Sequence, residues 1–155
     1  MAGTVDQRLS DLGITLPDPA APAANYIPYV ISGNLVFVSG QITMVDGELK
    51  YVGKVGDDFG IEEGYQAARI CAINLLAQLK IACGGDLDRV RRVVKLGGFV
   101  NCRPDFTDQP KVINGASDLM GEVLGDAGKH ARFAVGAPSL PLGIAVEVDG
   151  IFEID

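Results

Sequence analysis

Apolar residues that recur at intervals of three and four predict two long helices in this chain. One such stripe covers residues 61–83 and stops at the Gly84–Gly85 pair, which is typical of a helix end. A second stripe runs from about Gln109 to Leu124, with Asp108 as the expected N-cap and Pro110 in the first turn. The stripes consist of Ile61, Tyr65, Ala68, Ala72, Leu75, Leu76, Leu79 and Cys83, and of Val112, Ile113, Ala116, Leu119, Met120 and Val123.

Runs of β-branched and aromatic residues predict strands before, between and after these helices. Gly33–Asn34 joins the first two strands into a hairpin, and Asp46–Gly47 is a turn signal in a third, short strand. The double glycine at 97–98, inside a later strand, predicts either a bulge or the close approach of another backbone. The predicted strands are 29–31, 35–38, 45–49, 90–100, 132–137 and 143–154.

The last predicted strand indicates how the sheet is covered. Its even positions, from Ile144 to Ile154, are apolar apart from a glycine and suit a face packed against helices. Its odd positions mix apolar residues with carboxylates. The order of elements predicts an α+β fold in which both helices cover one face of a single mixed sheet. The mixed second face predicts contact with another subunit, with some acids left in an intersubunit cleft.

The N-terminal part differs in composition from the rest of the chain. Apolar spacing predicts a short helix within residues 1–13. Residues 15–28 contain four prolines, which favours an extended or irregular path. We therefore divide the chain into an N-terminal arm, residues 1–24, and a single domain, residues 25–155.

Composition and charge limit the classes of partner. The net charge of −7 argues against nucleic acid or an anionic membrane as the main partner, because both repel an acidic surface. No apolar run approaches the roughly 18 residues of a membrane span. The N-terminus is polar and carries acids, and the three cysteines form no C-x-x-C pair, so neither a targeting signal, a disulfide framework nor a zinc site is predicted. These features predict a cytoplasmic protein with reduced thiols.

Arg132 is the first candidate for chemistry. A guanidinium binds a carboxylate through two parallel charge-assisted hydrogen bonds, so an arginine at a strand start beside a cleft could orient a small acid. The alternative is an internal ion pair with Glu147 or Asp149. These two acids lie two positions apart, hence on one face of a strand, and either could activate water if burial raised its pKa. The alternative for them is a solvated edge strand whose charges oppose aggregation.

Other catalytic arrangements find little support in the sequence. His130 is the single histidine, and neither G-x-S-x-G nor a cysteine pair accompanies it. It is therefore interpreted as a loop residue, and no triad and no metal site is predicted. No G-x-x-x-x-G-K phosphate loop occurs. The Ser-Gly of FVSGQ, residues 37–41, predicts either backbone N–H groups that bind an anion or a simple turn.

Three features together resemble a known family: FVSGQI at 37–42, the helix–strand–helix order, and HARFAV followed by LPLGIAVEVDGIFEI within 130–154. They are similar to the RidA/YjgF reactive-intermediate deaminases, also labelled endoribonuclease L-PSP-like, over roughly residues 25–154. The resemblance implies a chorismate-mutase-like homotrimer with sites between subunits. It implies hydrolysis of enamines and imines, such as 2-aminoacrylate, to 2-oxo acids and ammonia, without a metal or cofactor. The proline-rich arm is longer than in compact members, which indicates a divergent subgroup.

The resemblance also implies roles for individual residues. Arg132 matches the arginine that holds the substrate carboxylate, and Asp149 matches the acid, usually Glu, that positions the attacking water. Phe133 stands where a small hydroxyl residue is usual. The residues matched to the binding pocket are Tyr26, Gly40, Asn114 and Ala134, the last standing where the best-known members have Cys.

Two other functions fit the same fold expectation. One is a non-catalytic module that binds or senses a small carboxylate, which the shorter Asp149 and the bulk of Phe133 favour. The other is a chorismate-mutase-type enzyme with an arginine-lined interface. The family that the chain resembles is also labelled endoribonuclease, but the acidic charge of this chain argues against RNA as its main substrate.

Overall fold

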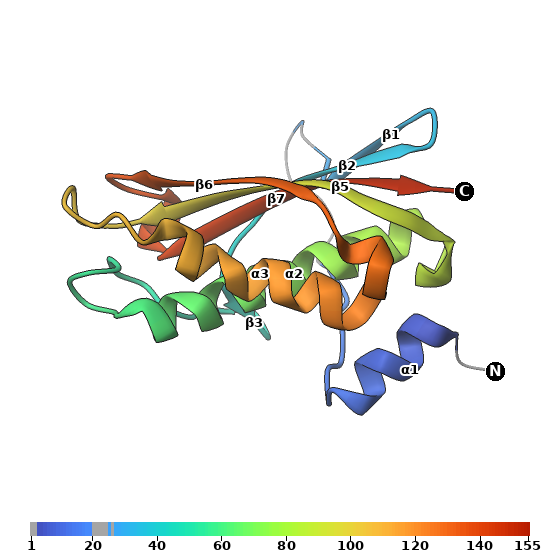
Figure 1. Cartoon of the computed structure of the whole chain (residues 1–155), viewed down its shortest axis with the longest axis horizontal. Helices are drawn as coiled ribbons and strands as arrows, with labels where there is room; N and C mark the ends of the chain where they lie inside the picture. Colours follow the sequence, from blue (N-terminus) through green and yellow to red (C-terminus); the bar gives the residue numbers. More distant parts are fainter. Residues whose placement is uncertain (1–2, 20–24, 26) are drawn as a thin grey trace.

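A computed structural model describes residues 3–19, 25 and 27–155 of the chain. Two long helices lie on one side of a sheet, and a short N-terminal helix lies against them (Figure 1). The α-helices are α1 (Thr4–Asp11), α2 (Ile61–Ala82) and α3 (Gln109–Leu124), with 3₁₀ turns η1 (Leu87–Arg89), η2 (Gly125–Gly128) and η3 (Pro141–Gly143). The strands are β1 (Tyr29–Ser32), β2 (Leu35–Gln41), β3 (Met44–Val45), β4 (Glu48–Leu49), β5 (Val90–Asn101), β6 (Ala131–Ala137) and β7 (Val146–Ile154).

The two predicted long helices are confirmed. In α2 the apolar stripe is buried from Ala68 onward, whereas Ile61 and Tyr65 in its first turns are partly buried. The helix ends at Cys83 because Gly84 and Gly85 take positive φ values of 67° and 97°. At its start, the Glu63 carboxylate accepts a hydrogen bond from the backbone N–H of Gly60 at 3.1 Å. In α3 the predicted apolar positions are likewise buried. Both helices therefore form where the 3.6-residue period places one apolar stripe against the sheet.

The main sheet has five strands in the order β1-β2-β7-β5-β6. Only β5 and β6 pair in parallel, because α3 crosses over between them, so the predicted mixed sheet is confirmed. The prediction of one strand over 45–49 was wrong, since β3 and β4 form a separate two-stranded hairpin. Asp46 and Gly47 both have positive φ, at 51° and 80°, which reverses the chain within two residues.

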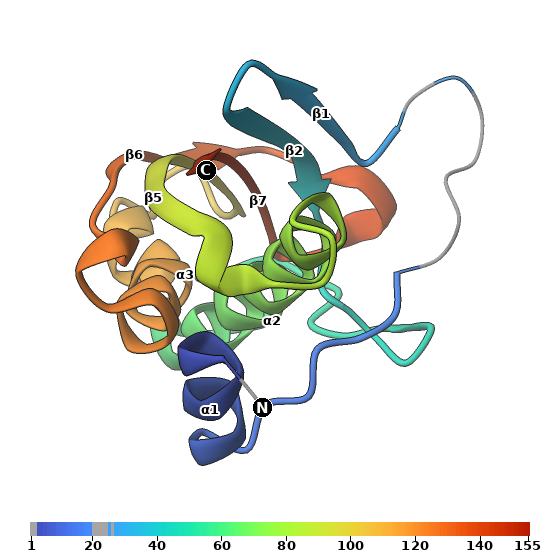
Figure 2. The same cartoon turned by 90° about the vertical axis from the view of Figure 1, so that its right-hand side faces the viewer.

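The two faces of the sheet have different environments. On β7 the even positions Val146, Val148, Phe152 and Ile154 are buried on the helix side, as predicted, where β7 packs against α2. Figures 1 and 2 show both long helices on this one side, and no helix of the described residues covers the other side. We call that other side the open face. Strand pairing joins its side chains across the sheet: Val30 with Phe37, Phe37 with Ile151, Phe99 with Glu147, and Phe99 with Val135.

Two glycines set the position of α3. A side chain at Gly98 of β5 would collide with Ile113 of α3, with contacts of about 2.6 Å. A side chain at Gly115 of α3 would lie 2.0 Å from the backbone oxygen of Tyr65 in α2. The double glycine at 97–98 makes room for the side chains of Asp149, Phe133 and Ile113, and not for another backbone as predicted. The irregular register of β5 lies earlier, between Val90 and Lys95.

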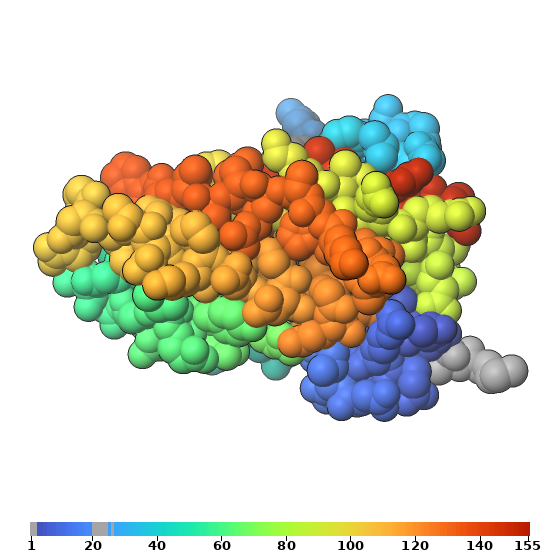
Figure 3. All heavy atoms as spheres, viewed as in Figure 1, coloured from blue at the N-terminus to red at the C-terminus, as the bar shows by residue number. Residues whose placement is uncertain are grey.

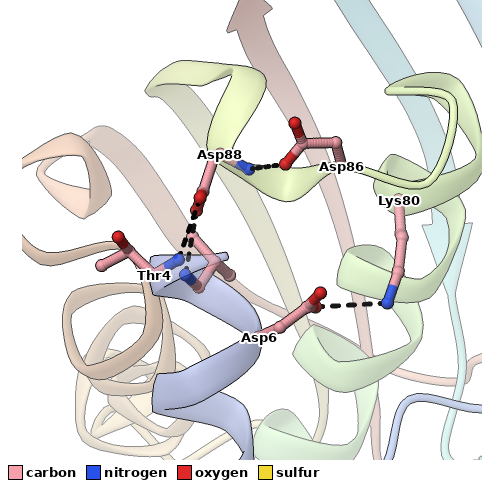
Figure 4. Close-up of polar contacts among 6 residues, drawn as sticks. Thr4, Asp6, Lys80, Asp86 and Asp88 are labelled. Carbon is pink, nitrogen blue, oxygen red and sulfur yellow. Dashed lines mark hydrogen bonds and ion pairs between the residues drawn. The ribbon is translucent and has the colours of Figure 1, made fainter. Parts of the chain in front are cut away.

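The short helix predicted near the N-terminus is confirmed as α1, and it is held by polar contacts (Figure 4). The Asp88 carboxylate accepts hydrogen bonds from the backbone N–H groups of Thr4 and Val5, each at 2.9 Å, and so caps α1 from another part of the chain. Lys80 pairs with Asp6 at 3.2 Å. Val5 and Leu9 are buried in the same apolar core as α2 and α3, and Figure 3 shows α1 packed against the end of α3. Within the described residues no helix is long and apolar enough to cross a membrane.

Candidate functional site

Arg132 lies at the second position of β6, an edge strand, and its side chain extends toward α3. Its Nη1 donates to Oδ1 of Asn114 at 2.9 Å and to Oγ of Ser117 at 3.1 Å. Both partners are neutral, and they lie three positions apart on one face of α3. No ion pair within the described residues includes Arg132, so the internal pair with Glu147 or Asp149 is not formed there. Within the described residues, the guanidinium charge is therefore not neutralised by an acid of the same chain.

The hydrogen bonds continue from Arg132 to His130. Nε2 of His130 lies 2.9 Å from Oγ of Ser117, and Nδ1 lies 2.6 Å from the backbone oxygen of Gly128. His130 immediately precedes β6, as its interpretation as a loop residue implied, but its ring is held at both nitrogens. Gly128, at the end of η2, is buried. The result is a continuous chain of contacts from η2 through His130 and Ser117 to Arg132.

Sequence reasoning gave no role to Ser117 and no partner to His130. Two spacing signals could have found them. Ser117 follows Asn114 by three positions in a helix, which places both side chains on one face. His130 and Arg132 are two apart around the start of a strand, which places both on one side of the sheet.

The carboxylates lie on the open face, opposite Arg132. A side chain at Gly40 would lie 3.0 Å from the Glu147 carboxyl carbon, so Glu147 covers this glycine directly. Partial burial raises the pKa of Glu147, and the negative charge of Asp149 raises that pKa further. Burial also raises the pKa of Asp149, although a backbone hydrogen bond at Gly97 and the charge of Lys95 lower it in part. Glu147 therefore holds its proton to a higher pH than an ordinary carboxyl group.

Phe133 forms an aromatic wall beside Asp149. A side chain at Gly97 would lie 2.6 Å from the Phe133 ring and 2.4 Å from an Asp149 oxygen, so both side chains fill the space that this glycine leaves. The Phe133 ring packs edge-on against Phe99, with centroids 5.3 Å apart, and Lys95 Nζ lies 5.5 Å from its centroid. Phe133 thus belongs to the open face and not to the Arg132 cluster.

The structure brings together some predicted site residues and separates others. Arg132 and Asn114 are in contact, and Ala134 lies on the same side of β6 and packs against the core. Gly40 lies beside Glu147, the acid that the resemblance left without a role. Within one chain, Arg132 and Asp149 lie on opposite sides of the sheet. Tyr26 lies outside the described residues.

A groove of about 380 Å³ lies elsewhere, between α1, residues 14–19 and α2, and none of the predicted site residues lines it. Within the described part of the chain, no group of three or more His, Cys, Asp or Glu side chains could hold a metal ion. The chemistry available here is therefore that of a guanidinium, two carboxylates and a histidine–serine pair.

Comparison with known proteins agrees with this fold. The family model described as "YjgF/chorismate mutase-like, putative endoribonuclease" matches residues 6–152. Protein TCP17 of Trypanosoma cruzi is 50% identical over 155 residues, which cover 99% of this chain and 96% of that protein. The solved structure of Atu1372 from Agrobacterium tumefaciens, a protein of unknown function, is 51% identical with a TM-score of 0.92, over 98% of this chain and 93% of that one. A "putative endoribonuclease" from Shewanella oneidensis is 39% identical with a TM-score of 0.93, over 98% of this chain and 100% of that one.

These matches span nearly the whole chain, and they confirm the resemblance that rested on the SGQI segment and the C-terminal strands. The α+β fold, with a mixed sheet and long helices on one face, is confirmed with them. The chain belongs to the YjgF/chorismate mutase-like family.

Proposed function

We propose that the protein hydrolyses small enamines or imines of the 2-aminoacrylate type to 2-oxo acids and ammonia. The observation that carries the proposal is the bonding of Arg132. Its guanidinium donates to two neutral oxygens and forms no ion pair within the described residues. A positive charge held in this way favours an anionic ligand, and the two-pronged geometry of a carboxylate suits it.

The proposed site forms between copies of the chain in a homotrimer. Arg132 and the carboxylates lie on opposite sides of one sheet, so a site that uses both needs the second half from another copy. The open face supports such an assembly, because Val30, Phe37, Phe99 and Val135 expose between 36% and 48% of their surfaces there. An apolar sheet face of this kind is buried more favourably against another protein surface than left in water.

In the proposed reaction Arg132 binds the substrate carboxylate and places the imine carbon for attack by water. An enamine first moves a proton from nitrogen to its terminal carbon to become the imine. A carboxylate then accepts a proton from the water as the water oxygen bonds to the imine carbon, and delivers it to nitrogen to give a carbinolamine. The hydroxyl proton of the carbinolamine follows the same route to nitrogen as the C–N bond breaks and the C=O bond forms. The products are the 2-oxo acid and ammonia, so atoms and charge balance without a cofactor. A base whose pKa lies closer to neutrality transfers such a proton in both directions more readily than an ordinary carboxylate.

The resemblance pointed to Asp149 as this base, whereas the geometry favours Glu147. Glu147 covers Gly40, which was matched to the pocket, and its pKa is raised both by burial and by the charge of Asp149. Asp149 instead lies against Phe133 and Gly97. We therefore assign proton transfer to Glu147, with Asp149 as the neighbour that raises its pKa.

A coupled assay tests this proposal. A dehydratase generates 2-aminoacrylate, and formation of pyruvate is compared with and without the protein. We expect acceleration by the wild-type protein and loss of it, by about a hundredfold in kcat/KM, in Arg132→Ala, because two charge-assisted hydrogen bonds are removed. Arg103→Ala is the matched control, since Arg103 is exposed and its one ion pair among the described residues is with exposed Asp105. No acceleration by the wild-type protein would reject the proposal.

Two alternatives give different results in the same preparation. A carboxylate-binding module would be stabilised against heat by 2-oxobutyrate without turnover. An RNA-cleaving enzyme, as the names of some relatives imply, would degrade a single-stranded RNA probe. The net charge of −7 opposes RNA binding, because phosphate contacts need a basic surface.

A further inference from the structure

We infer that Ser117 and His130 are positioning residues that determine which edge of the Arg132 guanidinium receives the ligand carboxylate. This inference deepens the proposed function and rests on it for the identity of the ligand. It rests on its own observation, the continuous hydrogen-bond chain between Gly128 and Asn114.

The first step is the tautomer of His130. The backbone oxygen of Gly128 can only accept a hydrogen bond, and it lies 2.6 Å from Nδ1, so Nδ1 carries the proton. A neutral imidazole has a single N–H group, so Nε2 is an acceptor. Oγ of Ser117, at 2.9 Å, then donates its single proton to Nε2. The serine oxygen is left with lone pairs only, directed at the guanidinium.

The second step is the use of the guanidinium hydrogens. Nη1 carries two, of which one goes to Asn114 at 2.9 Å and the other to Ser117 at 3.1 Å. Nη1 is thereby fully occupied. Among the described residues, Nε and Nη2 of Arg132 have no hydrogen-bond partner. Their N–H groups are parallel and lie along one edge, so a carboxylate binds side-on to the Nε–Nη2 edge.

The third step is the rigidity of the anchor. A side chain at Gly128 would lie 2.3 Å from the backbone oxygen of Met120 and 2.9 Å from the backbone nitrogen of Gly121, so the backbone at 128 packs directly on α3. Asn114 and Ser117 are also residues of α3. The chain of contacts therefore begins at a backbone packed on α3 and ends at a side chain of α3. His130 links the two, so the position of Arg132 is fixed relative to this helix. Without the Ser117 hydroxyl, Nη1 loses one of its two acceptors. The guanidinium is then free to rotate, and the Nε–Nη2 edge no longer has a fixed direction toward the ligand.

The test uses the whole 155-residue chain with Ser117→Ala, Ser117→Thr and His130→Gln. Lys129→Ala is the matched control, because Lys129 is exposed next to His130 and pairs only with exposed Asp126. Because the chain has one histidine, its ¹⁵N NMR spectrum at pH 8 reports a single imidazole. We expect the Nδ1–H tautomer in the wild type and a loss of defined Arg132 side-chain N–H signals in Ser117→Ala. An Nε2–H tautomer or a doubly protonated ring would overturn the inference.

Ligand binding supplies the functional readout. Calorimetric titration with 2-oxobutyrate is expected to show affinity weakened about fivefold in Ser117→Ala and His130→Gln, the effect of one lost hydrogen bond. Ser117→Thr restores the hydroxyl and is expected to regain most of the affinity, and Lys129→Ala is expected to match the wild type. In turnover, KM is expected to rise with kcat changed by less than about twofold, because the variants weaken the positioning of the bound carboxylate and leave the proposed proton-transfer group, Glu147, unchanged.

The two proposals fail in different ways. If the wild type binds 2-oxobutyrate through Arg132 but turns over no imine, the proposed reaction falls and the positioning roles are judged by the titrations. Equal affinity in Ser117→Ala, His130→Gln and the wild type would overturn the positioning roles even if turnover is intact. Absence of any 2-oxobutyrate binding by the wild type overturns both.

Discussion

The proposed site has two halves, one around Arg132 and one around the carboxylates Glu147 and Asp149. A single chain supplies all the contacts of the first half but only part of the surroundings of the second. The Arg132 half is built within the chain, where α3 and the turn before β6 supply a partner for each group from Gly128 to Asn114. The carboxylate half lies on the open face, where Phe99 is the strand partner of Glu147 and where Phe37 and Phe99 are both exposed. One half is complete within a single chain, and we propose that the other reaches its working environment only when a second copy covers it.

This difference separates binding from proton transfer. A guanidinium does not need a tuned pKa, so it needs only a fixed direction, which α3 provides. A carboxylate that moves protons needs an environment of low polarity, and an exposed sheet face provides only part of it. Contact with another copy would extend the burial that already raises the pKa of Glu147.

The largest expected effect distinguishes the two carboxylates. Glu147→Gln is expected to lower kcat by about a thousandfold, the usual contribution of a general base, while carboxylate binding stays intact. Asp149→Asn is expected to lower kcat no more than about tenfold and to shift the pH at which activity rises downward, because its charge raises the pKa of Glu147. Steady-state kinetics across pH measure both. The reverse ranking would return the catalytic role to Asp149.

The next effect concerns the cover of the open face. Phe99→Asp is expected to dissociate the assembly and reduce turnover at least about tenfold, because burial of an unpaired charge costs several kcal/mol. The Arg132 half is complete within one chain, so the variant is expected to keep the His130 tautomer. Light scattering and the imine assay measure the change. The control is Ile81→Asp, a substitution of an exposed apolar residue in α2, on the helix side. An active, fully assembled Phe99→Asp protein would contradict the role of this face.

A smaller effect is expected where neither half is involved. Asp88→Ala removes the carboxylate that caps α1 and is expected to cost about 1 kcal/mol of unfolding free energy, or about 3 °C in Tm. Calorimetry measures the loss. Values of kcat and KM are expected to equal those of the wild type at 25 °C. A changed KM would show that the α1 corner is coupled to the site.

The smallest effect is on stability against pH. Because the folded-state pKa of Glu147 is raised, its contribution to stability is full below the ordinary carboxyl pKa of about 4.3 and is lost as pH rises through the raised value. Glu147→Gln is therefore expected to raise Tm at neutral pH, by no more than about 2 °C, and to make no difference below about pH 4. A Tm that falls at neutral pH would show that the charged form is favoured instead.

Much of the fold could be predicted from the spacing of apolar residues along the chain. The stripes at α2 and α3 and the alternation on β7 were sufficient to predict which side of the sheet is buried, because burial follows residue spacing directly. The separate hairpin of β3 and β4 was missed, because two positive φ angles at Asp46 and Gly47 reverse a run that reads as one strand. Strand order was also beyond local patterns, since β2, β5 and β7 meet only after the chain has passed through two helices.

For the site, the arginine could be found from its place before a strand, but its partners could not. Ser117 meets His130 across 13 residues, and that distance is closed by the tight turn at Gly125–Gly128. Glu147 and Asp149 are indistinguishable by spacing. Their difference comes from Gly40 on β2 and Gly97 on β5, each of which leaves room for one of the two acids.

Gly98 in β5 and Gly115 in α3 allow the helix to lie close to the sheet and to α2. The direction of the Arg132 side chain therefore depends on two buried positions that no ligand contacts. A methyl group at Gly98 or Gly115 would push the helix away from the sheet or from α2, and Asn114 and Ser117 would move with it. A screen of random variants for carboxylate binding should therefore find strongly damaging substitutions at these buried glycine positions. In a homologue that keeps the arginine, a larger residue at either of these two positions would indicate that carboxylate binding is altered or lost.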